Sequence, residues 1–241
     1  MWAVSTTARI LTPNVALVNI GQALVRKIVS MLLLSTPLPY NEGYSKMSAT
    51  YHHENLRETL LSAAISLIGE VGPTAFTLRE VARRAGVSHN APYRHFRNRE
   101  DLLAAVASQG FRELAGAMRA ASQKQSDALD RLKDAGLAYV AFALRKPEHF
   151  TVMFDVPRSE DLSWDAAEAA KEAFSELSLL VQAVQANGHF AQNEPQQQTL
   201  YAWTTVHGIA KLATSGRLPW RTKSGIMRFA AFAIDQSLAG A

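Results

Sequence analysis

The sequence predicts an all-α protein, in which short N-terminal helices precede a larger helical domain. Apolar residues recur at three- and four-residue steps along most of the 241 residues, the pattern of helices that bury one face. Sustained strand-like alternation is almost absent, and glycine and proline divide the chain into segments of helix length. With 48% apolar residues, the chain can bury a substantial core.

The first expected helix is Glu54–Val71, which ends at the stop signal Gly72-Pro73. Glycine just past a helix adopts the left-handed conformation that terminates it, and proline cannot continue the helix. The expected buried face comprises Leu56, Leu60, Leu61, Ala64, Leu67, Ile68 and Val71.

Two short helices are expected next. Thr77 and Glu80 have the spacing of a capping box, in which each side chain accepts a hydrogen bond from a free backbone N–H of the first turn. This second helix should end before Gly86. Ser88 is expected to cap a third helix that reaches about residues 93–95.

The rest of the chain is also expected to be helical. Asn98 can cap a fourth helix that runs to about Ala121, with acids in its first turn that suit the helix dipole. Proline and glycine separate the later segments. These are Asp127–Leu144, Pro147–Phe154, Trp164–Ala186, Pro195–Thr214 and Lys223–Leu238.

Composition excludes several classes of chemistry. The chain has no cysteine, which rules out disulfides, zinc fingers, iron–sulfur clusters and thiol nucleophiles. No metal-ligand spacing, nucleophile motif or phosphate-cradling loop occurs. We therefore expect no enzyme, no catalytic residue, no bound metal and no cofactor. The net charge of +4, from 25 bases and 21 acids, permits nucleic-acid binding without arguing for it.

Most of that excess charge lies in residues 1–50, which hold four bases and one acid, a net charge of +3. The apolar run Ile28–Leu34 is too short to span a bilayer but has the size of a signal-peptide core. Ile20–Leu34 could instead form an interfacial amphipathic helix. The interpretation we favour is that residues 1–46 are an artefact of start-codon choice and that Met47 is the biological start.

Residues Thr77–Phe96 have the spacing of a helix-turn-helix, two short helices around a tight turn. Ala82 is small enough for the two helices to cross closely, and Gly86 permits a positive φ in the turn. The shared core should include Leu78, Val81, Val87 and Phe96.

The exposed side of this motif is polar and basic. The second helix of such a motif lies in the DNA major groove, with its N-terminal residues nearest the bases. Its exposed side chains here are Ser88, His89, Asn90, Tyr93, Arg94 and His95. Between Thr77 and Arg99 the local charge is +5, from six arginines against Glu80. Arg79, Arg97 and Arg99 are therefore expected to contact phosphates.

Residues 54–101 resemble the DNA-binding domain of the TetR family of bacterial transcriptional repressors. The resemblance rests on the apolar first helix ending at Gly72, on "FTLREVARRAGVS" and on "YRHFRNREDLL". It implies an all-helical homodimer whose N-terminal helices bind DNA and whose larger C-terminal domain binds a small ligand. It also implies three parts: an extension over 1–50, a DNA-binding domain over 51–98 and a ligand-binding and dimerisation domain over 99–241.

Carried over by position, the resemblance implies backbone contacts from Thr77, Tyr93, His95 and Arg99, and contacts at or near the bases from residues 88–90. Two departures concern the base contacts. Lysine or arginine and then glycine or proline often follow the serine in the family, where this chain has His89 and Asn90. Pro92 replaces a bulky aliphatic residue and implies a helix that starts close to Asn90.

The C-terminal part resembles a second family pattern, the Trp-His-Gly type, through Trp203, His207 and Gly208. The resemblance implies that the last two helices form a four-helix dimer interface with their mates. A lipophilic effector is expected among the middle helices, with His207 as a polar anchor. Candidate lining residues, which could equally be ordinary core, are Phe142, Phe150, Met153, Phe154, Trp164, Phe174, Trp203 and His207.

These observations predict a ligand-responsive repressor that binds a roughly palindromic operator as a homodimer and leaves it when a small molecule binds. The protein is expected in the cytoplasm, associated with the nucleoid, with no membrane partner. The alternative is a helical module that senses a ligand or binds a protein without specific DNA binding. Loss of DNA affinity on substituting Tyr93 and His95 would discriminate between the two.

Overall fold

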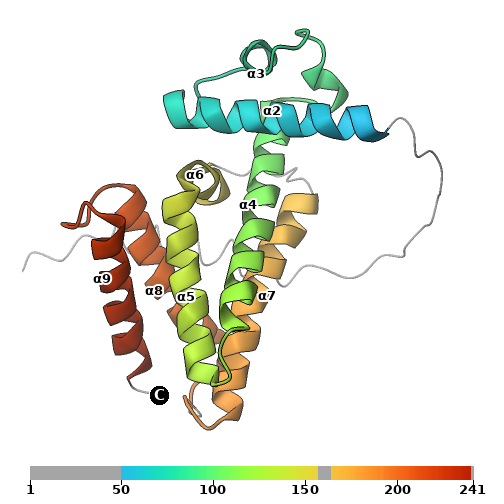
Figure 1. Cartoon of the computed structure of the whole chain (residues 1–241). Coiled ribbons are helices and arrows are strands. Elements are labelled where there is room, and N and C mark those ends of the chain that lie inside the picture. The colour runs from blue at the N-terminus through green and yellow to red at the C-terminus, as the bar shows by residue number, and fades with distance from the viewer. Residues whose placement is uncertain (1–49, 157–163, 191, 240–241) are drawn as a thin grey trace, which may run out of the picture. The chain divides into compact units, whose positions relative to one another are not determined.

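In the computed structural model, the described residues are 50–156, 164–190 and 192–239, and every regular element among them is helical (Figure 1). The helices are α2 (Thr50–Val71), α3 (Leu78–Arg84), the 3₁₀ turn η1 (Pro92–Arg94), α4 (Arg99–Ser122), α5 (Ala128–Arg145), α6 (Pro147–Asp155), α7 (Trp164–Ala186), α8 (Pro195–Thr214) and α9 (Lys223–Leu238). The predicted fold class is confirmed. The expected N-terminal extension lies outside the described residues.

The helix boundaries follow local capping chemistry. The Asp127 carboxylate accepts hydrogen bonds from the backbone N–H groups of Leu129 and Asp130 at 2.8 and 3.1 Å, which starts α5. Prolines occupy the first positions of α6 and α8, where the missing N–H costs nothing. The helix expected over Glu54–Val71 begins earlier, at Thr50.

The predicted third helix is wrong in its form and its cap. Only the three residues Pro92–Arg94 form a 3₁₀ turn, with Ala91 at the N-cap position and no side-chain cap from Ser88. Proline has no N–H, so the α-helical hydrogen bond from residue 92 to the carbonyl of Ser88 cannot form. The Ser88 carbonyl instead accepts from Ala91 N–H at 2.9 Å, a tighter, three-residue step.

A core of buried apolar side chains joins α2, α3 and the start of α4. Leu78, Val81 and Phe96 are buried in it and Val87 packs against it, as predicted. Leu102, Leu103 and Val106 of α4 also belong to this core. The N-terminal turns of α4 therefore stabilise the helix-turn-helix directly.

The C-terminal helices pack around α4 and α5. In Figure 1, α4 runs beside α7 and α5, and the contacts agree with that view. On its other side, α5 packs against α8 and α9. Gly136 of α5 allows a close approach, because a Cβ there would lie 3.2 Å from side-chain atoms of both Val206 and Ile234.

Candidate functional site

The start of α3 is held by the predicted capping box. The backbone N–H of Thr77 donates to Glu80 Oε2 at 2.7 Å, and the N–H of Glu80 donates to Thr77 Oγ1 at 3.3 Å. The Thr77 hydroxyl also lies 2.9 Å from Glu80 Oε2, to which it donates. Both residues are exposed, so Thr77 stands at the surface with its orientation fixed.

Arg84 fixes α3 on α2 through an interaction that sequence reasoning missed. Its Nη1 and Nη2 atoms lie 2.6 Å from Glu70 Oε1 and Oε2, a two-point ion pair, and Nη1 also donates to Ser66 Oγ. The hydrogen bond from Arg84 lowers the pKa of Glu70. Fourteen residues separate the partners, so no local sequence pattern predicts the pair.

The turn after α3 presents the predicted recognition residues. Exposed side chains occur at Ser88, His89, Asn90, Tyr93 and Arg94. Tyr93 is 51% exposed, unusual for a large ring, whereas Ala91 and Pro92, which precede it, are buried. His95 is only half-buried and packs beside Phe96, with 6.3 Å between ring centroids.

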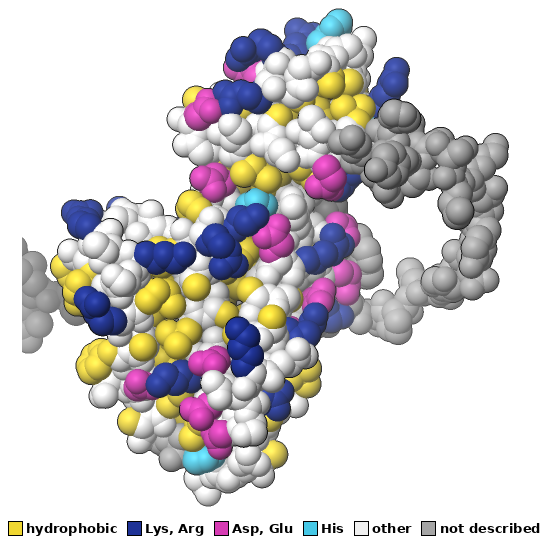
Figure 2. Space-filling model, viewed as in Figure 1, with side chains coloured by type: hydrophobic (Ala, Val, Ile, Leu, Met, Phe, Trp, Pro, Cys, Tyr) yellow, Lys and Arg dark blue, Asp and Glu magenta, His cyan; other side chains and the backbone are white. Residues whose placement is uncertain are grey.

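The arginines of this region fall into two groups. Arg84, Arg97 and Arg99 pair with Glu70, Asp101 and Glu100. Within the described part of the chain, Arg79, Arg83 and Arg94 form no ion pair, and all three are exposed. In Figure 2, basic side chains gather over α3 and the turn that follows it. Unpaired arginines on one exposed surface can bind phosphate groups.

Arg97 and Arg99 are more constrained than the sequence suggested. Arg99 donates from Nη1 to the backbone carbonyl of Thr74 at 2.6 Å and pairs with Glu100 at 3.0 Å. It thereby ties the start of α4 to the loop before α3. Arg97 pairs with Asp101 at 3.2 Å, which lowers the pKa of that carboxyl, yet its side chain stays 77% exposed.

A second cluster, of aromatic rings, surrounds His207 in the C-terminal helices. The centroid of the His207 ring lies 4.6 Å from that of Phe154, 5.1 Å from that of Trp203 and 5.5 Å from that of Phe150. Phe150 and Phe154 are themselves 4.9 Å apart. We call these four residues, with Tyr139, the aromatic cluster. Four of the eight predicted ligand residues therefore come together here.

Three of the other predicted ligand residues, Phe142, Met153 and Phe174, form no ring contact with this cluster among the described side chains. Met153 faces α4, where a Cβ on Gly110 would lie 2.5 Å from its Sδ. Phe142 is fully buried on α5, and Phe174 is half-buried on α7. The side chain of Trp164 lies outside the described part of the structure.

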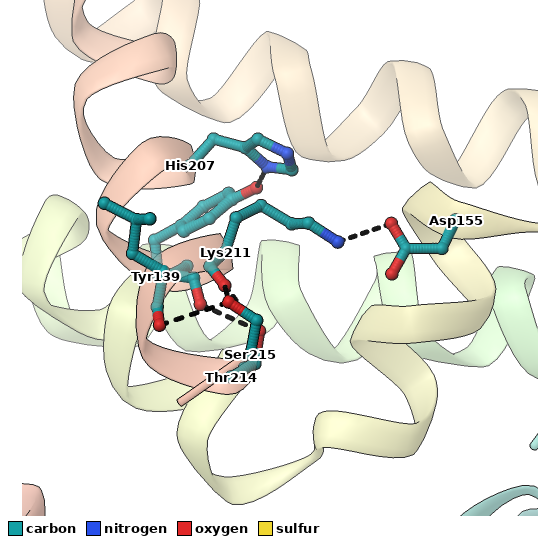
Figure 3. A network of polar contacts seen from close by, with 8 residues as sticks. Tyr139, Asp155, His207, Lys211, Thr214 and Ser215 are labelled. Atoms are coloured by element: carbon teal, nitrogen blue, oxygen red, sulfur yellow. Dashed lines mark hydrogen bonds and ion pairs between the residues drawn. The ribbon is translucent and has the colours of Figure 1, made fainter. Parts of the chain in front are cut away.

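Tyr139 completes the cluster and was missed from the sequence. Its hydroxyl lies 2.8 Å from His207 Nδ1, across 68 residues of chain (Figure 3). Burial raises the pKa of Tyr139 far above its ordinary value. Burial also lowers the pKa of His207, to about 4, with a further contribution from Lys211. Both rings are therefore uncharged at neutral pH.

An ion pair borders the aromatic cluster. Lys211 Nζ, one turn after His207, lies 2.5 Å from Asp155 Oδ1 at the end of α6 (Figure 3). The pair neutralises both charges and joins α8 to α6. Among the described residues, no group of three or more acidic or histidine side chains is arranged to hold a metal ion.

Large exposed apolar side chains mark one face of α8 and a point on α9. Tyr201 and Leu212 of α8 are 52% and 44% exposed, and Phe232 of α9 is 59% exposed. Gly208 lies on the same face of α8, and a Cβ added there meets no atom within 4 Å. None of the described helices is long and apolar enough to cross a membrane.

Two family models match the chain in sequence. One, described as bacterial regulatory proteins of the tetR family, matches residues 60–106. The other, the tetracycline repressor-like C-terminal domain, matches residues 132–236. The tetracycline repressor protein class A from transposon 1721 of Escherichia coli is 47% identical over 49 residues, which is 20% of this chain and 23% of that repressor.

Solved structures extend the similarity over both domains. A protein of unknown function from Rhodococcus sp. RHA1 is 32% identical, with a TM-score of 0.66 over 84% of this chain and 100% of that one. The regulator FadR from Bacillus subtilis, solved with stearoyl-CoA, shares the fold alone. Its TM-score is 0.65 at 14% identity, over 76% of this chain and 98% of that one. Helix-turn-helix geometry, both family models and these folds agree: the chain belongs to the TetR family of bacterial regulatory proteins.

Proposed function

We propose that the protein is a transcriptional repressor that binds a roughly palindromic operator as a homodimer and dissociates when a small molecule binds its C-terminal domain. The observation that carries this is the exposed surface of the helix-turn-helix. It combines polar groups that can read bases with Arg79, Arg83 and Arg94, which are exposed and form no ion pair in the described chain.

The residues of this surface take different roles in the proposal. Asn90 can pair with adenine through two hydrogen bonds, and Ser88 and His89 stand beside it. Phosphate contacts, which set the register of the protein on the duplex, come from Thr77, Arg79, Tyr93 and Arg94. Arg97 keeps an exposed guanidinium for the same purpose, whereas Arg99 acts chiefly by holding the Thr74 loop.

The dimer would form through the face of α8 that carries Tyr201, Gly208 and Leu212, together with Phe232 of α9. Exposed apolar side chains on adjacent helices are typical of a surface that another copy covers. Two recognition turns related by a two-fold axis would enter successive major grooves, about 34 Å apart.

The effector would bind at the aromatic cluster around His207. Support comes from α6, which supplies Phe150 and Phe154 to this cluster and Val152 to the helix-turn-helix core. A ligand that displaces α6 would thus favour a dimer geometry that no longer fits the operator. FadR from Bacillus subtilis, of the same fold, binds stearoyl-CoA. For this chain, the ring content of the cluster supports an apolar effector.

The DNA-binding proposal is tested by fluorescence anisotropy on DNA from upstream of the gene, against a scrambled duplex. Arg94→Ala should weaken binding to both duplexes and reduce the slope of log affinity against log salt by about 0.9. Asn90→Ala should reduce the preference between them. The control is Lys124→Ala, an exposed cation between α4 and α5. Equal, salt-insensitive binding of both duplexes by the unsubstituted protein would refute the proposal.

Dimerisation is tested separately by sedimentation equilibrium. Leu212→Glu places a charge in the proposed interface and should shift the protein towards monomer. Leu179→Glu on α7 is the matched control, because Leu179 is also an exposed leucine, at 61%, on a helix that does not belong to the proposed interface. If the two variants dissociate equally or neither does, the interface is elsewhere.

A further inference from the structure

The hydrogen bond between Tyr139 and His207 sets which nitrogen of the imidazole carries the proton. Tyr139 is 2% exposed, and its hydroxyl lies 2.8 Å from Nδ1 of His207. A neutral imidazole has one N–H donor and one bare nitrogen that accepts. The hydroxyl could donate to a bare Nδ1 or accept from a protonated one, so the distance alone leaves two arrangements.

Burial of the Tyr139 hydroxyl decides between them. If Nδ1 carried the proton and donated to the Tyr139 oxygen, the buried hydroxyl proton would have no acceptor within the described part of the chain, where Nδ1 of His207 is its hydrogen-bond partner. A buried donor without an acceptor is costly, whereas an oxygen can leave a lone pair unused. The Tyr139 hydroxyl therefore donates to Nδ1, which leaves the imidazole proton on Nε2.

The Nε2 atom of His207 is available to a ligand. It forms no hydrogen bond within the described part of the chain, and it is not among the buried polar atoms that lack a partner, so solvent reaches it. In Figure 3, this nitrogen points away from the Tyr139 hydroxyl. The rings of Phe154, Phe150 and Trp203 surround the imidazole at 4.6–5.5 Å, so its neighbours are apolar faces.

Charge around this donor is balanced. Lys211 is the nearest cation to His207 along α8, and Asp155 neutralises it at 2.5 Å. A carboxylate ligand would have to compete with Asp155 for Lys211, and an ammonium ligand would meet a donor rather than an acceptor at Nε2. An uncharged oxygen acceptor on an apolar body matches the site best.

We infer that His207 is held as its Nε2–H tautomer by Tyr139 and that the effector is an apolar molecule which presents an uncharged carbonyl oxygen to that N–H. Tyr139 is in this sense a positioning residue, since it acts through His207. The inference rests on the proposed function only in taking the aromatic cluster as the effector site. The tautomer itself is independent of DNA binding.

The tautomer is read by ¹⁵N NMR of protein labelled in histidine, with His207 assigned by its loss in His207→Asn. Nε2 should show the shift of a protonated nitrogen and Nδ1 that of a bare one. In Tyr139→Phe, both shifts should move towards the average of two exchanging tautomers. Lys124→Ala, at an exposed cation between α4 and α5, should leave them unchanged. A protonated Nδ1 in the unsubstituted protein overturns the inference, even if Tyr139→Phe does not fold.

The ligand class is tested with nonan-2-one, nonane, nonanoate and nonylamine. Nonan-2-one should shift the Nε2–H signal, and Tyr139→Phe should weaken its binding about two- to tenfold, the effect of one hydrogen bond of ordinary net strength. Tighter binding of nonanoate or nonylamine, or no response of Nε2 to nonan-2-one, overturns the carbonyl assignment. A protein that passes both tests yet ignores operator DNA would refute only the proposed function.

Discussion

Val152 and Phe154 stand two positions apart on α6 and contact different clusters of side chains. Val152 is 4% exposed within the core shared by α2, α3 and the start of α4. The Phe154 ring packs edge-on against His207, 4.6 Å away. Two residues span about 200° on an α-helix, so the two side chains leave opposite faces. Helix α6 therefore packs against both the helix-turn-helix core and the aromatic cluster.

This division predicts different effects of truncation on the two faces of α6. Val152→Ala should lower the free energy of unfolding by about 2 kcal/mol, because two buried methyl groups contribute ~0.8 kcal/mol each and the cavity adds to the loss. It should also accelerate amide exchange in α2 and α3. Phe154→Leu should leave the amides of α2 and α3 protected. Hydrogen-exchange mass spectrometry checks both, and identical exchange maps would contradict the division.

Gly110 and Gly116 of α4 should respond in opposite directions to alanine. A Cβ at Gly110 would lie 2.5 Å from Met153 Sδ and 3.2 Å from His149 Cβ, whereas at Gly116 it meets nothing within 4 Å. Gly110→Ala should destabilise the protein by about 1–3 kcal/mol. Gly116→Ala should stabilise it by about 0.5–1 kcal/mol, since alanine favours the helix.

Urea denaturation measures both glycine variants. A double-mutant cycle with Met153→Ala separates two sources of the cost, because this change removes the flexible thioether and leaves the His149 contact. In the Met153→Ala background, Gly110→Ala should cost less stability than it does in the unsubstituted protein. Stabilisation by Gly110→Ala alone would show that α4 and α6 are further apart than the described contacts require.

The capping box makes Thr77 a stability residue as well as a proposed phosphate contact. Thr77→Ala removes the acceptor for the Glu80 N–H and should cost about 1 kcal/mol. Thr77→Ser retains the hydroxyl and should stay within a few tenths of a kcal/mol of the unsubstituted protein. Urea denaturation gives the stabilities. If Thr77→Ala is as stable as Thr77→Ser, the cap does not stabilise α3.

Local signals were enough to predict most of the helices. The predicted bounds of α5 to α9 agree with the structure within one residue, because Asp127, Pro147 and Pro195 act on the backbone beside them. The start of α2 lies four residues before the predicted Glu54, and Val71, predicted on its buried face, is 51% exposed. A larger local failure is at Pro92, where the missing N–H left a 3₁₀ turn instead of a capped helix. At this position Ser88 favours a capped helix, whereas Pro92 lacks the N–H that the first helical turn needs. The effect of Pro92 is the larger one.

The contacts that build the two sites could not be read from the sequence. Arg84 and Glu70 are 14 residues apart, and Tyr139 and His207 are 68 apart. Such pairs depend on how helices cross, which residue spacing within one helix does not fix. The same limit explains Met153, whose helical spacing suited the aromatic cluster equally well but which faces Gly110. The sequence therefore predicted which residues could take part in the two sites, but not which residues each of them contacts.

Two histidines should make the free energy of unfolding depend on pH. Burial lowers the pKa of His207 to about 4 and also lowers that of His149, which is 1% exposed. Neither ring nitrogen of His149 has a hydrogen-bond partner within the described chain. Both groups bind protons more weakly in the folded state than in the unfolded state, whose histidines titrate near 6.5.

The free energy of unfolding should therefore be highest above about pH 6.5 and fall as the pH is lowered towards about 4. In this window the unfolded chain takes up protons that the folded protein excludes. For His207 alone the loss can reach about 3 kcal/mol at pH 4, from 1.36 kcal/mol for each unit of pKa difference. Urea denaturation at a series of pH values measures it. His207→Asn should flatten the slope between pH 4 and 6.5, and His89→Asn, at an exposed site, should not. A slope that His207→Asn leaves unchanged would show that the folded protein does not lower the pKa of His207.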